Sequence, residues 1–262
     1  MTRLFKLLAP PLVTFLIVLC GWSYVTAPGG LPSYLLPPPA AVAQALWLGL
    51  ASGEFWPHIV FTLSSTVIGY VIGSVLAVIA GVLVAESRLF ERFVFPYIVA
   101  IQATPKVALA PLILVWFGFG LASKVVLVAL ICFFPLLVNT IGGIRRTDPE
   151  LIAMARSFSR PAWWIFVHIK LPAAASAIFA GLEIGIVLAL IGAVVGEFVA
   201  SERGVGYLIG AATVNMNVAV MFAGVIILAA FGVFSSLIVR TVQKRTVFWE
   251  QAPSELPTGE RP

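Results

Sequence analysis

Long apolar stretches separated by short charged segments make up most of the chain. A mainly apolar stretch of about 20 residues is long enough to cross a bilayer as an α-helix. The pattern therefore predicts an all-α fold, a polytopic membrane helical bundle with six transmembrane helices. The predicted spans are Leu7–Val25, Ile59–Ala85, Phe93–Phe117, Val125–Ile144, Ala173–Val199 and Val218–Val239.

The composition agrees with a membrane location. Apolar residues make up 61% of the 262 residues, charged residues make up 10%, and the mean hydropathy is +1.07. A soluble domain carries about 25% charged and about 45–50% apolar residues, so a water-soluble fold of this size has no way to hide so much apolar surface. The bilayer must be the solvent for most of the chain.

The net charge of +5 does not indicate a nucleic-acid partner. Basic residues in a membrane protein reflect its topology, and here they cluster beside the apolar stretches. The two cysteines, Cys20 and Cys132, lie inside apolar stretches with no CxxC or Cys/His spacing. This placement favours packing over a redox or metal role. We therefore expect no nucleic-acid partner and no metal site.

The first apolar stretch raises the question of a signal peptide. Leu7–Val25 follows Arg3 and Lys6, as the apolar part of a signal peptide follows its basic start. It is long for such a segment, however, and no clear small-x-small cleavage site follows it. Trp22 and Tyr24 close it instead, as aromatic residues do at a membrane interface. We predict a retained transmembrane helix.

The charges of the connections predict the topology. Basic residues accumulate in every second connection, whereas the intervening connections hold only Lys124 and Arg203. Lys and Arg are enriched in cytoplasmic loops, so we predict a multi-pass protein of the bacterial inner membrane with both termini in the cytoplasm. The residues then on the inner side are Arg3, Lys6, Arg88, Arg92, Arg145, Arg146, Arg156, Arg160, Lys170, Arg240, Lys244 and Arg245.

Three segments follow from this topology. Residues 1–58 hold the first span and an outer segment, in which Ala40–Ala51 is predicted to form a short interfacial helix. Residues 59–245 form the main membrane domain, with a long cytoplasmic loop at 145–172. The tail at 246–262 is polar and rich in proline, and we expect it to be disordered.

Glycine is frequent in the second and fifth predicted spans. In lipid, small residues at near-helical spacing allow two helices to approach closely. We expect these glycines to pack a compact bundle rather than to form a substrate site. They are Gly69, Gly73, Gly81, Gly181, Gly185, Gly192 and Gly196.

The loop at 145–172 is longer than a connection between spans needs to be. Asp148, Pro149 and Glu150 form a typical helix start, with a capping side chain, a proline at the first position and an acid near the positive end of the helix dipole. The predicted helix is amphipathic. Its apolar side consists of Leu151, Met154, Ala155 and Phe158.

The same loop predicts a second short helix. The first helix ends near Ser159–Arg160, Pro161 begins the next one, and Pro172 marks the entry to the fifth span. Two short amphipathic helices at a cytoplasmic surface have two explanations. They lie in the lipid headgroup region, or they insert into a groove on a protein partner. The residues alone do not choose between the two.

The loop resembles the "EAA" loop of binding-protein-dependent import permeases. That loop has the pattern E-A-A, three residues, Gly, nine residues, then I-x-L-P. The matching residues here are Glu150, Ala153, Ala155 and Ile169–Pro172. Ser159 stands in place of the family glycine. The similarity covers about Pro57–Arg245, including the stretches WFGFG, GLEIG, ALIGAVVGEF and GVGYLI, which are similar to the nitrate, sulfonate and taurine branch.

The resemblance implies a permease subunit of an ATP-binding-cassette importer, which forms the solute pathway across the inner membrane. The chain has no GxxxxGK[ST] phosphate loop, so we expect no enzyme activity and no bound cofactor. ATP is then used by a separate cytoplasmic subunit. The other implied partners are a periplasmic or lipid-anchored solute-binding protein, a second permease copy (identical or not) and membrane lipid. The residues that the resemblance assigns to ATPase coupling are Asp148, Glu150, Leu151, Ala153, Met154, Ala155, Phe158, Ser159 and Pro172.

Lys106 lies midway through the third predicted span, beside Pro105 and near Pro111. A charge at the centre of a membrane helix costs about 2.5–3.5 kcal/mol on insertion scales and usually faces an interior or water. Lys106 either attracts an anionic solute into the pathway or extends toward the interface from a break in a shorter span. Both interpretations remain open.

Other polar residues of the spans are candidates for the same pathway. Gln102, Thr104 and Asn139 either line a cavity or make ordinary interhelical hydrogen bonds. Glu183 is a candidate partner for the lysine. Glu197 lies near the outer end of its span, where a solvated acid and a gating residue are the alternatives. We find no paired acids or catalytic triad, so enzyme chemistry is not expected.

The resemblance implies a small organic or anionic solute of the sulfonate, taurine, nitrate or pyrimidine-precursor type. The alternative function is an ion-coupled secondary transporter, a class that often shows inverted repeats and buried acidic relays. We find no convincing repeat, and Glu183 is the only acid deep enough in a span to serve as a relay.

Overall fold

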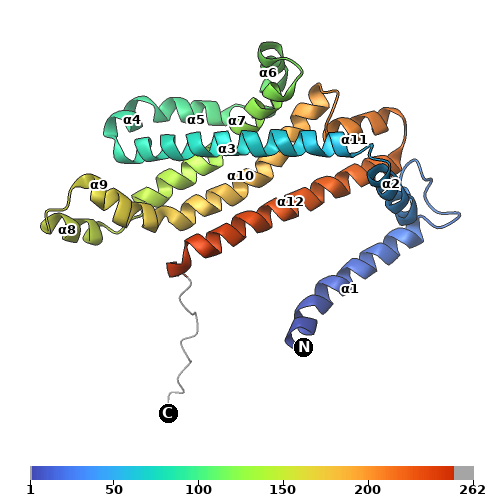
Figure 1. Ribbon diagram of the computed structural model, residues 1–262, viewed down its shortest axis with the longest axis horizontal. Helices are drawn as coiled ribbons and strands as arrows, with labels where there is room; N and C mark the ends of the chain where they lie inside the picture. The colour runs from blue at the N-terminus through green and yellow to red at the C-terminus, as the bar shows by residue number, and fades with distance from the viewer. Residues whose placement is uncertain (1, 251–262) are drawn as a thin grey trace.

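The computed structural model describes residues 2–250, which form helices joined by short connections and, over this range, no β-strand. Four long helices form the body of the molecule (Figure 1). The predicted all-α fold is confirmed. The four helices are α3 (Trp56–Glu86), α7 (Leu121–Arg145), α10 (Leu171–Val199) and α12 (Val218–Thr246).

The predicted count of six membrane spans is not confirmed, because the described residues contain four clear apolar spans, or up to five. A bent pair of helices, Phe95–Ala103 with Lys106–Phe117, adds a fifth span if it is counted as one. The first predicted span falls in α1 (Thr2–Val25), in which the described apolar stretch is Leu12–Val25. The described chain therefore has four helices long enough to cross a membrane: Trp56–Glu86, Leu121–Arg145, Ala162–Val199 and Val218–Thr246.

The third predicted span is wrong as a single helix. It consists of α5 (Phe95–Ala103), the 3₁₀ helix η1 (Lys106–Leu109) and α6 (Ala110–Phe117), and its two halves meet at an angle of 88°. Pro105 has no backbone N–H, and a residue that precedes proline is disfavoured in the α-helical region. Thr104 is accordingly extended, with a ψ of 133°, and the helix ends there.

Helix α7 lies at the centre of the body, where it packs against both α3 and α10. The glycines predicted to pack the bundle face it, because a Cβ atom added to any of them would meet an atom of α7. At Gly73, for example, the added atom would lie 2.6 Å from the backbone oxygen of Ala129. The packing role of these glycines is confirmed.

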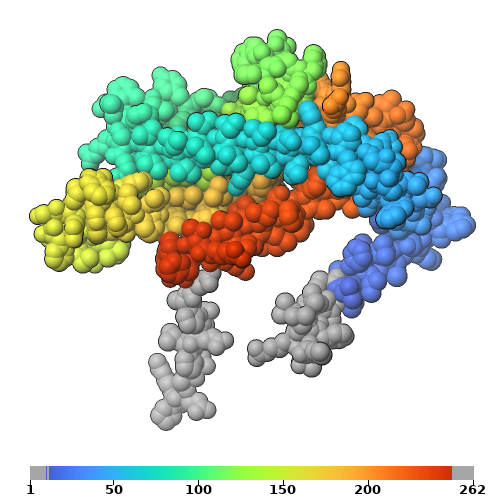
Figure 2. Space-filling model, in the orientation of Figure 1, coloured from blue at the N-terminus to red at the C-terminus, as the bar shows by residue number. Residues whose placement is uncertain are grey.

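Helix α1 leans away from the body and reaches it through α2 (Pro39–Ala51) (Figures 1 and 2). Helix α2 confirms the short helix predicted at 40–51. The indole N–H of Trp22 donates to the carbonyl of Pro37 at 2.9 Å, and its ring centre lies 5.5 Å from that of Phe222. Trp22 therefore ties the end of α1 to the start of α2 and to α12.

At the other end of the chain, α12 extends to Thr246, and a short 3₁₀ helix, η3 (Phe248–Glu250), follows it. The tail predicted to be disordered, 246–262, therefore begins in helical structure. Its residues 251–262 lie outside the described part of the chain.

Candidate functional site

The long loop begins with helix α8 (Pro149–Ser157), as the sequence predicts. The carboxylate of Asp148 accepts a hydrogen bond from the backbone N–H of Glu150 at 2.8 Å, and Pro149 occupies the first helical turn. This cap satisfies one of the N–H groups that every helix start leaves unpaired, and its negative charge is favourable at that end of the helix dipole. Helix α8 therefore has a fixed start, and it lies at one end of the body (Figure 1).

Helix α8 has an apolar surface that the described chain does not cover. The side chains of Met154 and Phe158 are 53% and 72% exposed, and Leu151 beside them is also exposed. Ala155 is instead buried, so one of the four residues on the predicted apolar side packs against the protein and the other three are exposed. The exposed members of the predicted coupling set are Asp148, Glu150, Leu151, Ala153, Met154, Phe158 and Ser159.

The end of α8 explains the glycine of the resembled loop. Ser159 has a backbone φ of +54°, in the left-handed region that glycine adopts most readily. The N–H of Arg160 donates to the carbonyl of Ala155 at 3.2 Å, and the N–H of Ser159 donates to that of Arg156 at 2.9 Å. These two bonds form a Schellman motif, in which glycine is the usual left-handed residue.

Replacing this serine by glycine is therefore expected to stabilise the loop. A residue with a side chain in the left-handed region costs about 1–2 kcal/mol. Glycine avoids this cost but has more conformational freedom in the unfolded chain, which offsets part of the benefit. Ser159→Gly should therefore stabilise the folded loop by about 0.5–1 kcal/mol. Hydrogen exchange of the α8 amides measures it, and exchange should slow by a few fold. The control, Ser157→Gly, places glycine inside the helix and should speed exchange. Faster exchange in both variants would contradict the prediction.

The second predicted helix is not separate from the fifth span. Helix α9 (Ala162–Ile165) continues through a π-helical turn, η2 (Phe166–Lys170), into α10, and together they form one helix of 38 residues, Ala162–Val199. Pro172 therefore lies inside this helix and does not mark its start. Because proline has no N–H and crowds the preceding turn, a wide π turn directly before it keeps the helix continuous.

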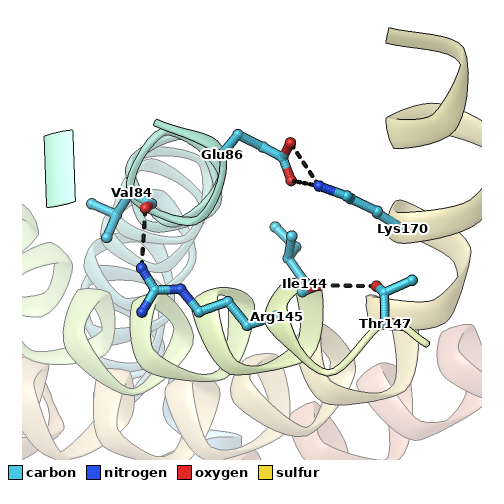
Figure 3. Close-up of polar contacts among 6 residues, drawn as sticks. All are labelled: Val84, Glu86, Ile144, Arg145, Thr147 and Lys170. Carbon is cyan, nitrogen blue, oxygen red and sulfur yellow. Dashed lines mark hydrogen bonds and ion pairs between the residues drawn. The ribbon is translucent and has the colours of Figure 1, made fainter. Parts of the chain in front are cut away.

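Polar contacts hold both flanks of the loop to the end of α3 (Figure 3). The ammonium of Lys170 lies 2.7 and 2.9 Å from the two carboxylate oxygens of Glu86. On the other flank, Arg145 donates to the carbonyl of Val84 at 3.4 Å and pairs with Glu91 of α4 (Arg88–Phe93) at 2.8 Å. Each partly exposed pair contributes at most about 1 kcal/mol. Together they attach the base of the loop to the bundle at two places.

Three of the predicted pathway residues meet at one cavity of about 490 Å³. Gln102 and Lys106 lie at the bend between α5 and α6, and Asn139 lies on α7. The Lys106 ammonium donates to the carbonyl of Gln102 at 3.1 Å and lies 4.6 Å from the centre of the Phe134 ring. Lys106 is thus both at a helix break and beside a cavity. Thr104 bonds a carbonyl of its own helix and does not line the cavity.

Glu183 is not the partner of Lys106. Its carboxylate accepts hydrogen bonds from the guanidinium of Arg240 at 2.6 Å and from the hydroxyl of Ser236 at 3.4 Å, both on α12. The pairing suggested by the sequence is therefore wrong. The acid links α10 to α12, and its partner lies 57 residues away along the chain.

Glu197 is not the solvated acid that its place near a span end suggests. It is 1% exposed, and its carboxylate accepts from the hydroxyl of Thr62 and from the N–H of Gly206, both at 2.7 Å. The Thr62 oxygen also accepts the N–H of Val205 at 2.8 Å. The acid and the hydroxyl therefore bond the first N–H groups of α11 (Val205–Val214), a helix that the predicted spans omit.

Lys124 is a second buried charge at the same end of the body. The sequence places it in a connection, but it lies in the first turn of α7 and is 1% exposed. Its ammonium donates to the carbonyls of Phe119 at 2.7 Å and Ala200 at 2.6 Å. Ala200 follows the last residue of α10, the helix that carries Glu197. We call these residues, with Thr62, the buried polar cluster.

Long apolar helices with an exposed, capped, amphipathic helix at one end define a membrane protein. The chain belongs to the family of binding-protein-dependent transport system inner membrane components, whose model matches residues 73–248. It is a permease subunit of an ATP-binding-cassette importer, and the ATPase of such a system is a separate polypeptide. This membership supports the ATP-driven importer over the ion-coupled carrier.

Three curated relatives show the branch. The riboflavin transport system permease protein RibX of Chloroflexus aurantiacus is 38% identical over 91% of this chain and 89% of its own. The formylaminopyrimidine transport permease protein ThiX of Halalkalibacterium halodurans is 30% identical over 96% and 99%. The taurine transport system permease protein TauC of Escherichia coli is 25% identical over 90% and 88%. The predicted branch is confirmed.

A solved structure shows the same fold. A chain of the MetNI methionine ABC transporter, in an inward-facing conformation, superposes with a TM-score of 0.59. The match covers 76% of this chain and 96% of that one at 17% identity. At this identity the similarity concerns the arrangement of helices alone.

Proposed function

We propose that α8 is the coupling helix, through which the separate ATPase subunit moves the membrane bundle. The observation that carries this proposal is the exposed apolar set of Leu151, Met154 and Phe158 on α8. The helix is capped at both ends, by Asp148 at its start and by the left-handed Ser159 at its end. An amphipathic helix with free apolar side chains suits a groove on a protein partner. Because both ends are capped, the helix moves as a rigid unit when the groove on the ATPase moves.

The base of the loop supports the same role. The contacts of Lys170 with Glu86 and of Arg145 with Val84 connect the two flanks of α8 to α3. The second flank continues without a break into α10. A displacement of α8 is therefore passed to two long helices of the bundle. Such rigid-body movement of helices about an interface is a common means of switching between two states.

The complete importer needs more than the described spans. We infer that α1 and the bent pair also cross the membrane, which makes six spans with both termini in the cytoplasm. Helix α1 has 24 residues, enough for a span, and the exposed apolar side chains of Phe15, Ile17 and Val18 suit lipid or a second permease copy. A periplasmic or lipid-anchored solute-binding protein delivers the solute. In view of the relatives, that solute is a small organic molecule of the flavin, pyrimidine-precursor or sulfonate type.

Polar substitution of the apolar set should detach the ATPase. The double variant Leu151→Gln/Met154→Gln removes two apolar side chains from the proposed interface, each worth about 1 kcal/mol or more. Because about 1.4 kcal/mol is a factor of ten, ATPase association should fall at least about tenfold. The measurement is recovery of the untagged ATPase subunit with the tagged permease from detergent-solubilised membranes.

The control places the same side chain on the other side of the helix. Arg156 lies about half a turn away from the centre of the apolar set, so Arg156→Gln should leave ATPase recovery unchanged. Membrane insertion should be equal in all variants, since none of these residues lies in a span. Full recovery of the ATPase with the double variant would remove α8 from the coupling role.

A further inference from the structure

We propose that a groove between α3, α5 and α7 binds one acyl chain of an anionic phospholipid, whose headgroup lies on Arg88 and Arg92 of α4. The proposal concerns a bound lipid and goes beyond the proposed function, because it depends neither on the coupling role of α8 nor on the transported solute. The groove has a volume of about 500 Å³. Its walls include Ile72 and Leu76 of α3, Ile98 and Ile101 of α5, and Ala129 and Phe133 of α7.

The groove is suited to a hydrocarbon chain. Every residue that lines it is apolar or glycine, so a polar solute would lose hydrogen bonds to water there without gaining others. The groove is open along one side, because Ile72, Leu76 and Ile101 are 44%, 53% and 47% exposed. Helices α3 and α7 are long and apolar enough to cross a membrane. Lipid chains are therefore the apolar molecules that surround the opening, and one of them can fill the groove to the packing density of a protein interior.

Helix α4 places two arginines at the end of α3. Arg88 and Arg92 are one helical turn apart, so their side chains lie on the same face. Both are exposed, and neither guanidinium has a partner among residues 2–250. The one acid of α4, Glu91, is already paired with Arg145 at 2.8 Å. Two guanidiniums thus remain available for a phosphate group, whose geometry they match.

The other side chains of α4 suit the level of the lipid headgroups. Leu89 and Phe93 are 66% and 62% exposed and lie on the face next to the arginines, at about 100° per residue. An apolar face beside a basic face is typical of a helix at the membrane interface. The Ser87 hydroxyl accepts the N–H of Phe90 at 3.4 Å, and the ion pair with α7 holds the same helix to the body. The position of the arginines relative to the groove is therefore fixed.

The distance between the arginines and the groove matches a lipid chain. Leu76 and Glu86 are ten positions apart on α3, which is about 15 Å at about 1.5 Å per residue. Helix α4 begins just after this end of α3, and α5 follows it in line (Figure 1). The hydrocarbon region of one leaflet is also about 15 Å deep, half of about 30 Å. A phospholipid with its phosphate on α4 therefore has its chains at the depth of the groove.

A second copy of this chain fits the same face less well than a lipid does. Two copies have the same orientation in a membrane, so a symmetric contact through this face would bring the arginines of both to the same depth. Like charges that face each other across a contact repel. An anionic headgroup instead neutralises the arginines, so the charge of this face favours the lipid.

The test is native mass spectrometry of the purified permease–ATPase complex with one of three lipids added. Palmitoyl-oleoyl phosphatidylglycerol has the inferred charge and chains, phosphatidylcholine with the same chains has no net charge, and dihexanoyl phosphatidylglycerol has the same headgroup with short chains. Each arginine near an anionic lipid is worth about a factor of five, so the first lipid should bind at least about tenfold more tightly than phosphatidylcholine. It should also bind at least about tenfold more tightly than the short-chain lipid, which leaves the groove unfilled.

Two results with these lipids would overturn the proposal. One is equal binding of phosphatidylcholine or of the short-chain lipid. The other is a complex that retains none of the three lipids, which would indicate that a protein surface covers the groove.

Variants of α4 test the headgroup site. Arg88→Gln/Arg92→Gln should reduce the preference for phosphatidylglycerol over phosphatidylcholine at least about tenfold, whereas Arg88→Lys/Arg92→Lys should keep most of it. The matched control, Arg156→Gln/Arg245→Gln, removes two exposed arginines from α8 and α12 and should keep the full preference. Equal losses in the two glutamine variants would mean that the preference comes from the overall charge of the protein, and the site on α4 would be wrong.

A variant of α5 tests the groove separately. Ile101→Trp places a larger side chain in the lining and should weaken phosphatidylglycerol binding at least about fivefold, since overfilling a packed site costs about 1–3 kcal/mol. Val99→Trp is the control, because Val99 is equally exposed on the same helix but does not line the groove. It should bind the lipid as the unaltered protein does. Equal binding by the two tryptophan variants would show that the chain does not lie in the groove.

Discussion

Glu197→Ala is expected to lower the stability of the bundle by about 3–5 kcal/mol, the combined cost of a cavity and of two buried hydrogen-bond donors left without their acceptor. The substitution removes a side chain that is 1% exposed and leaves a cavity in its place. It also removes the acceptor of the Thr62 hydroxyl and of the Gly206 N–H, which form bonds of 2.7 Å in the intact protein. Unpaired buried donors add about 1–3 kcal/mol each.

The measurement is the temperature at which the solubilised permease loses its monodisperse peak in size-exclusion chromatography. For a chain of this size, a loss of this magnitude lowers the midpoint by on the order of 10 °C. Glu197→Gln keeps one acceptor oxygen, so its midpoint should lie between those of the unaltered protein and of Glu197→Ala. The control is Glu202→Ala, an exposed acid five residues further along the chain, which should melt within a degree or two of the unaltered protein. Equal midpoints for Glu197→Ala and Glu202→Ala would show that the buried polar cluster does not stabilise the bundle.

The sequence predicted the features that depend on neighbouring residues. The start of α8 was predictable because Asp148, Pro149 and Glu150 are consecutive, and a cap needs nothing else. The short helix α2 was predictable from a run without breakers after the prolines of the outer segment. Glycine spacing predicted close helix packing in α3 and α10, because helical periodicity places these residues on one side, and in the structure that side meets α7.

The features that depend on distant residues were not predictable from the same patterns. The hydrogen bond between Glu197 and Thr62 joins residues 135 positions apart, and nothing local distinguishes it from a solvated acid. The bend at Pro105 was hidden because average hydropathy is high on both sides of the break. Proline is common at the start of helices, but here a π-helical turn before Pro172 keeps the helix continuous. An apolar stretch in the sequence thus predicts the length of a membrane segment but does not show whether the segment is one continuous helix.

Gly73→Ala is expected to destabilise the bundle by about 2–3 kcal/mol, at the upper end of the range for overpacking a well-packed core. An added Cβ would lie 2.6 Å from both the Ala129 carbonyl oxygen and the Cys132 sulfur on α7, and 2.9 Å from the Ala129 Cα. Two of these three atoms belong to the backbone, so no side-chain rotation relieves the contact. Helices α3 and α7 must separate, and the loss spreads to the residues packed between them.

Gly185→Ala is the matched control, because it adds the same methyl group against the same part of α7. There the nearest atoms are the ring of Tyr70 at 3.5 Å and the Cys132 carbonyl oxygen at 3.7 Å, which are ordinary contacts. Since alanine is also about 1 kcal/mol better than glycine inside a helix, Gly185→Ala should melt at or slightly above the midpoint of the unaltered protein. The measurement is the temperature at which each variant loses its monodisperse peak in size-exclusion chromatography. A fall of similar size in both would mean that glycine is needed on α3 and α10 for a reason other than the distance to α7.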